Sequence, residues 1–181
     1  MQPISEHHPL RRHFAAAIEH VFCTEVGLCD PLLTDYLAEL LVSFTHIDRL
    51  TNFPDLGGRR LEQVAAKLGV LFDDPPTDAS KREQTAYRHI GDFTLFWAGM
   101  YPEHLRRSVR MASDVLVDYV TQGKKSYAIV ADLAQADDVP PARLFRHLSD
   151  DFEYCLHGLG IVRREWERPE LHSSGDSDLI V

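Results

Sequence analysis

The residues best placed to do chemistry lie in Tyr87–Pro102, YRHIGDFTLFWAGMYP, near the middle of the chain. From Ile90 onward this segment is almost continuously apolar, which is typical of a helix covered on most sides. His89 and Asp92 are one helical turn apart, so their side chains would share a face. A buried carboxylate needs a partner, because an isolated buried charge is strongly destabilising. Asp92 is therefore the polar residue whose role most needs explaining.

Two interpretations of Asp92 follow. In the first, the carboxylate is an internal clasp that fixes the register of neighbouring helices. Its candidate partners are then His89, Arg88, Tyr127 and Tyr119. In the second, a carboxylate–histidine pair lines a small-molecule pocket, and the carboxylate sets the tautomer of the imidazole. We predict the clasp, and we keep as candidate ligand-binding residues His89, Asp92, Tyr127, His46 and His157.

Ten histidines raise the question of a metal site. Di-iron bundles need Glu-x-x-His on two helices, whereas Glu153–His157 reads Glu-x-x-x-His and has no second copy. His20, Cys23 and Cys29 match no zinc-site spacing. Nucleophile-elbow and phosphate-loop motifs are also missing from the sequence. The sequence therefore predicts no catalytic residue, no metal and no cofactor.

Charge and cysteine content narrow the class of protein. The chain has 19 Lys and Arg against 28 Asp and Glu, and its net charge of −9 argues against binding to nucleic acid or to anionic membranes. The three cysteines include no Cys-x-x-Cys pair, which fits a reducing compartment better than a disulfide framework. The N-terminus lacks the apolar region of a secretory signal, and no apolar run is long enough to span a bilayer. We therefore expect a cytoplasmic protein.

The elements that must position Asp92 are helical. Helix-period patterns and short loops predict an all-α, single-domain bundle of six or seven helices around the central apolar helix. We assign residues 1–162 to this domain and residues 163–181 to a polar, flexible C-terminal tail. A capping box at Ser80–Glu83 predicts that the central helix begins at Lys81. The predicted helices are Arg11–Thr24, Leu32–Ile47, Arg59–Leu71, Lys81–Met100, Glu103–Thr121, Ser126–Ala136 and Ala142–Leu159.

Two glycines need an explanation: Gly91 lies inside the predicted central helix, and Gly123 follows the predicted helix Glu103–Thr121. A glycine inside a helix costs about 1 kcal/mol relative to alanine, so Gly91 needs a structural reason. Close approach of a neighbouring helix or of a ligand would supply one, and we predict helix packing. Gly123 is expected to end or kink its helix, or to serve a similar packing role.

The pattern Tyr87-x-x-x-Gly91-Asp92-x-x-Leu95-Phe96-x-x-Gly99-x-x-Pro102, followed by Gly123-x-x-x-Tyr127, resembles a set of uncharacterised bacterial proteins. The segment Tyr36–Leu50, YLAELLVSFTHIDRL, is similar to the same set, so the resemblance covers much of residues 30–130. It implies a bacterial, cytoplasmic, helical protein and carries no activity.

Two functions remain open. The first is a non-enzymatic protein acting through protein–protein contact, as a homodimer or a regulatory partner. It is favoured by the missing catalytic motifs and by the cluster Trp97, Met100 and Tyr101, since aromatic residues and Met are enriched at interfaces. The second is a helical small-molecule-binding protein or enzyme with a His/Asp/Tyr-lined pocket. A cavity beside these side chains would distinguish the second from the first.

Overall fold

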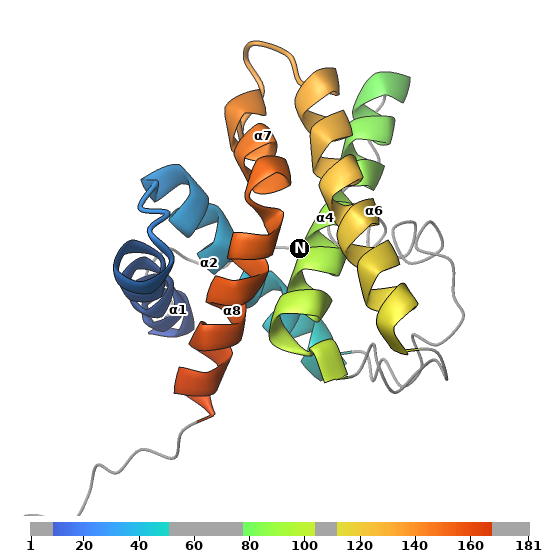
Figure 1. Ribbon diagram of the computed structural model, residues 1–181. Coiled ribbons are helices and arrows are strands. Elements are labelled where there is room, and N and C mark those ends of the chain that lie inside the picture. Colours follow the sequence, from blue (N-terminus) through green and yellow to red (C-terminus); the bar gives the residue numbers. More distant parts are fainter. Residues whose placement is uncertain (1–8, 51–77, 104–111, 168–181) are drawn as a thin grey trace, which may run out of the picture.

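The computed structural model describes residues 9–50, 78–103 and 112–167 (Figure 1). Within these ranges the chain is helical and contains no strand, which confirms the all-α prediction. A π-helical turn, η1 (Phe22–Val26), follows the first helix. The described residues form six α-helices: α1 (Pro9–Val21), α2 (Pro31–Leu50), α4 (Ala79–Met100), α6 (Ala112–Leu133), α7 (Ala142–Asp150) and α8 (Phe152–Trp166).

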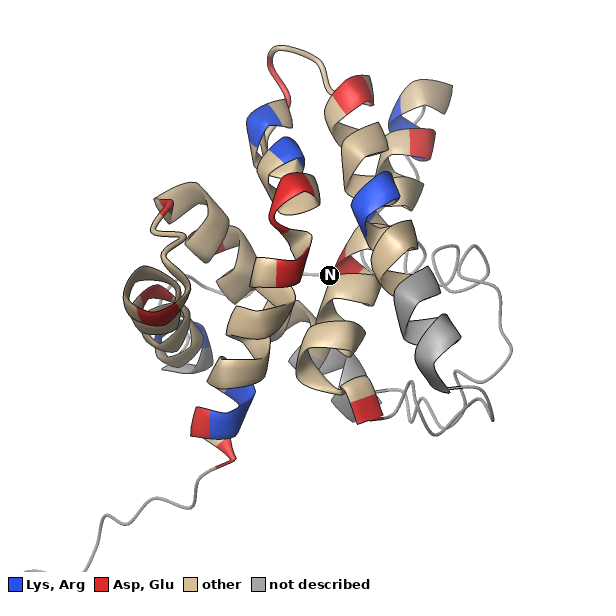
Figure 2. Ribbon diagram, in the orientation of Figure 1, with Lys and Arg blue, Asp and Glu red and all other residues tan. Residues whose placement is uncertain are grey.

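Helix α4 is the central element. Every residue from His89 to Met100 is buried, and α4 contacts α2, α6 and α8. Figure 1 shows it between α6 and α8, with α1 on the other side of α8 and α2 running behind α8 toward α4. The apolar composition of its second half explains this position, because a helix that is apolar all round can only be stable when it is covered. Figure 2 shows charged residues of both signs along the outer helices, whereas this half of α4 carries one charge, that of Asp92.

The start of α4 differs from the prediction. Asp78 is the N-cap, and its side chain accepts a hydrogen bond from the backbone nitrogen of Ser80 at 3.2 Å. The helix therefore begins at Ala79 rather than at Lys81. An aspartate accepts from the free N–H groups of a first turn as well as a serine does, so Asp78 can take the place predicted for Ser80.

The predicted break at Gly123 is wrong, because α6 runs through it without interruption. The alternative prediction, a packing role for Gly123, is confirmed. A Cβ at this position would lie 2.5 Å from both Thr94 Oγ1 of α4 and Phe152 Cζ of α8.

The helix predicted as Ala142–Leu159 is divided into α7 and α8 at Asp151, which leaves helical geometry with φ −104° and ψ 25°.

The last helix extends past the predicted start of the C-terminal tail at residue 163. Helix α8 continues to Trp166, so residues 163–166 are helical rather than part of the predicted tail. Arg163 fastens this end of α8 to the end of α4, because its Nη1 donates to the carbonyl oxygen of Met100 at 2.5 Å and pairs with Glu103 at 2.6 Å. The predicted helix Arg59–Leu71 lies outside the described residues.

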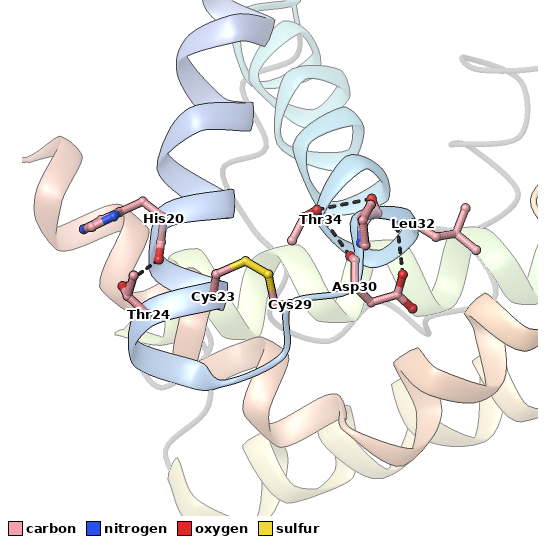
Figure 3. The surroundings of a disulfide bond; sticks show 8 residues. His20, Cys23, Thr24, Cys29, Asp30, Leu32 and Thr34 are labelled. Atoms are coloured by element: carbon pink, nitrogen blue, oxygen red, sulfur yellow. Dashed lines mark hydrogen bonds between the residues drawn. A yellow bond between two sulfur atoms is a disulfide. The ribbon is translucent and has the colours of Figure 1, made fainter.

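A disulfide joins Cys23 of η1 to Cys29, just before α2 (Figure 3). The expectation of unpaired cysteines is therefore wrong for this pair. The chain reverses after η1 through Gly27, whose φ of 81° is left-handed, and the two Cα atoms come within 4.4 Å. Sequence spacing alone did not reveal this turn. The remaining cysteine, Cys155, is unpaired and buried in the core.

Candidate functional site

Asp92 binds two neighbouring helices at once. The hydroxyl of Tyr36 on α2 donates to Asp92 Oδ1 at 2.5 Å, and the hydroxyl of Tyr127 on α6 donates to the same oxygen at 2.7 Å. All three residues are buried. Hydrogen bonds to an ionised acceptor are stronger than neutral ones, so this cluster joins α2, α4 and α6 at a fixed register. The predicted clasp is present, with Tyr127 as one of its predicted partners.

Close packing positions the two tyrosines. The ring of Tyr127 lies against the backbone of Gly91, where a Cβ would be 2.6 Å from Tyr127 Cε1. The ring of Tyr36 meets Phe145 of α7 edge-on, with centroids 5.7 Å apart. Gly91 therefore has the packing role predicted for it, and its absent side chain makes room for the Tyr127 ring.

Arg88 completes the cluster from the preceding turn of α4. Its Nε donates to the hydroxyl of Tyr36 at 3.2 Å and lies 3.7 Å from Asp92 Oδ2. The guanidinium also lies over the Tyr36 ring, 5.5 Å from the centroid, within the range of a cation–π contact. Neither terminal nitrogen of Arg88 has a protein hydrogen-bond partner among the described residues.

The electrostatics of the cluster keep both tyrosines neutral. Burial, and next the negative charge of Asp92, raise the pKa of Tyr36 above its usual value of 10.0. The same two causes, in the same order, raise the pKa of Tyr127. Interaction with Tyr36 raises the pKa of Arg88, against the effect of its burial, and Asp92 raises it further. The hydroxyls therefore remain donors, and the guanidinium remains charged.

A cavity of about 190 Å³ opens beside the cluster, between α2 and α4. Asp92 Oδ2 accepts no hydrogen bond from the described residues, because Arg88 Nε at 3.7 Å is too far away for one. The cavity thus combines two apolar side chains, Leu40 and Phe44, with a carboxylate, a guanidinium and a hydroxyl. Its lining residues are Tyr36, Glu39, Leu40, Ser43, Phe44, Arg88, His89 and Asp92.

The structure brings together three of the five predicted site residues. His89 and Asp92 line the cavity, and Tyr127 supports Asp92 from behind. His157 is exposed on α8 and does not line this cavity. His46 belongs to α2, but its side chain lies outside the described residues.

Tyr36 is the site residue that the sequence analysis missed. A signal for it existed, because Tyr36 falls three residues after Leu33 and four before Leu40, on the apolar stripe of α2. A buried tyrosine hydroxyl needs a partner, and a carboxylate on a central helix is a natural acceptor. Tyr119, offered as a candidate partner, is half-buried and donates to no side chain among the described residues.

The arrangement can bind a small molecule through polar groups that are held in place by packing. Within the described part of the chain, no group of three or more His, Cys, Asp or Glu residues could hold a metal ion. In the same ranges no helix has the length and apolar character that crossing a bilayer requires.

Comparisons with protein-family models, with curated proteins and with solved structures found no match to this chain.

Proposed function

We propose that the protein binds a small molecule in the cavity between α2 and α4. One observation carries the proposal: Asp92, only 9% exposed, presents Oδ2 at the wall of this cavity without a hydrogen bond from the described residues. A carboxylate oxygen that faces a cavity and accepts from no protein donor can accept hydrogen bonds from a bound molecule. Convergent polar groups beside apolar side chains, here Leu40 and Phe44, are a feature of ligand sites.

Crystals soaked with a library of small polar fragments would test this proposal. We expect fragments to collect beside Asp92, between Tyr36 and Phe44. Fragments found only at other surfaces of the protein would contradict it. A Ser43→Leu variant supplies the control, because Ser43 lines the cavity and a leucine there would fill part of it.

Protein–protein contact, as a homodimer or with a regulatory partner, is the second candidate. The aromatic cluster that first suggested it is largely internal, since Trp97 is 6% and Met100 is 1% exposed. A contact at the connection between α6 and α7 would cover Val139, which is 93% exposed. Light scattering of the purified protein would show a dimer, and Val139→Asp would weaken it if Val139 lies in the interface.

A bacterial, cytoplasmic origin also remains a prediction. The resemblance of residues 30–130 and the cysteine content led to it. The Cys23–Cys29 disulfide favours an oxidising compartment instead, because disulfides are rare in reducing cytosol.

A further inference from the structure

We propose that the cavity beside Asp92 takes a small neutral molecule with a carboxamide-like edge, in which an N–H donor stands next to a carbonyl acceptor. This inference rests on the proposed function, because it names the class of ligand for the same cavity. Two polar groups at the cavity wall, Asp92 and Arg88, have opposite hydrogen-bonding requirements and carry the argument.

Asp92 requires a donor. Its Oδ1 already accepts from Tyr36 and Tyr127, whereas Oδ2 accepts no hydrogen bond from the described residues. A carboxylate has about four acceptor positions, so Oδ2 retains its full capacity. Asp92 lines the cavity, so an N–H group of a ligand can donate a charge-assisted hydrogen bond to Oδ2.

Arg88 requires an acceptor. Its Nε is engaged by Tyr36, but its two terminal nitrogens have no protein partner among the described residues. The side chain is 40% exposed and lines the cavity, so these nitrogens can reach a bound molecule. A guanidinium binds planar acceptors well because its N–H groups form a rigid fork.

The local charges favour a neutral ligand. Asp92 and Arg88 lie within 3.7 Å of each other and cancel. Glu39, also on the cavity wall, is balanced by Arg11 at 3.1 Å. An anionic ligand would satisfy Arg88 but meet the charge of Asp92, and a cationic ligand would do the reverse. A carboxamide edge meets both requirements without adding a charge.

The size of the cavity limits the rest of the molecule. About 190 Å³ is well below the 300–1,000 Å³ typical of drug-sized sites, and it suits one ring with a short polar group. Leu40 and Phe44 supply an apolar wall for such a ring. We therefore expect the carboxamide edge to face Asp92 and Arg88, and the ring to face Phe44.

Four probes of nearly identical shape test the class directly: benzamide, benzoate, benzamidinium and acetophenone. Each would be titrated into the full-length protein and followed by the NMR shifts of backbone amides. We expect benzamide to bind about tenfold more tightly than each of the other three, because each lacks one matched hydrogen bond. Asp92→Asn should shift the preference toward benzoate, since the amide nitrogen replaces an acceptor with a donor.

The ranking in the unsubstituted protein decides the proposal even if Asp92→Asn does not fold. Tighter binding of benzoate, benzamidinium or acetophenone around Asp92, or equal binding of all four, would overturn the carboxamide class and leave the cavity as a binding site. If no probe shifts the amides around the cavity, both this inference and the proposed function fail.

Discussion

The ring of Tyr127 lies so close to Gly91 that a Cβ there would be 2.6 Å from Tyr127 Cε1. Because the Tyr127 ring can lie against the backbone of the central helix at Gly91, its hydroxyl donates to Asp92 Oδ1 at 2.7 Å. One missing side chain thus permits the hydrogen bond that joins α6 to α4. The ligand proposal depends on that contact, because it holds Oδ1 in place and leaves Oδ2 at the cavity wall.

Gly91→Ala should destabilise the protein. The added methyl group would overlap the Tyr127 ring, and overpacking of this kind costs about 1–3 kcal/mol. The higher helix propensity of alanine offsets part of that loss, by about 1 kcal/mol. Urea unfolding followed by circular dichroism measures the difference.

Gly160→Ala is the matched control. Gly160 also lies within a helix, but a Cβ there would meet its nearest atom, the carbonyl oxygen of Gly99, at an ordinary 3.7 Å. We expect it to be neutral or to stabilise by up to about 1 kcal/mol. If Gly91→Ala were as well tolerated as Gly160→Ala, the close contact with Tyr127 would be refuted.

Tyr127→Phe should reduce stability by about 1–2 kcal/mol, because Asp92 loses one of its two hydroxyl donors in a buried site. Tyr154→Phe provides the comparison, since Tyr154 is 60% exposed and makes no side-chain hydrogen bond among the described residues. Equal unfolding free energies for the two variants would contradict the role assigned to the Tyr127 hydroxyl.

Stability should fall steeply above pH 10. The pKa values of Tyr36 and Tyr127 are raised in the folded protein above the usual 10.0, so the unfolded chain loses these protons first. The tyrosines contribute their full stabilisation below about pH 10, and this is lost as the pH rises, because the folded state then binds more protons than the unfolded state.

Ultraviolet absorbance of tyrosinate would follow this titration. Among the six tyrosines of the chain, the pKa values of Tyr36, Tyr119 and Tyr127 are raised, first by burial in each case. We expect a delayed fraction of the ionisation in the folded protein and a single transition near pH 10 in urea. Tyr127→Phe should make the fall in stability shallower. Identical titrations of folded and unfolded protein would rule out the buried cluster.

Thiol counting tests the disulfide. Denatured without reductant, the protein should show one reactive thiol, that of Cys155, and three after reduction. In the folded state Cys155 should react slowly, because burial, and next the charges of Asp151 and Glu153, raise its pKa to about 12. Three thiols before reduction would show that Cys23 and Cys29 are unpaired in solution.

The sequence predicted the parts of this structure that depend on local pattern. Periodicity located the central helix, and the cost of isolating a charge singled out Asp92 and its need for a partner. The division at Asp151 and the continuity of α6 through Gly123 depend on contacts between helices. A glycine has the same local signature whether it ends a helix or admits a neighbour, so the sequence left both roles open for Gly123.

The candidate site was predictable only in part, for a related reason. Tyr36 lies 56 residues from Asp92 in the chain, and only the packing of α2 on α4 brings their oxygens to 2.5 Å. The cavity itself is a product of that packing. His157 lies on the helix predicted as Ala142–Leu159, and periodicity did not reveal that it is exposed on α8 and does not line the cavity.

The central claim is that the cavity beside Asp92 binds a small molecule. An NMR titration of the protein with benzamide, up to the solubility of benzamide, tests it most directly. We predict shift changes concentrated at residues 36–44 and 88–92, lost in Ser43→Leu and retained in Ser80→Leu, which places the same bulk at an exposed serine. No change in these residues, or changes of equal size in both variants, would contradict the account.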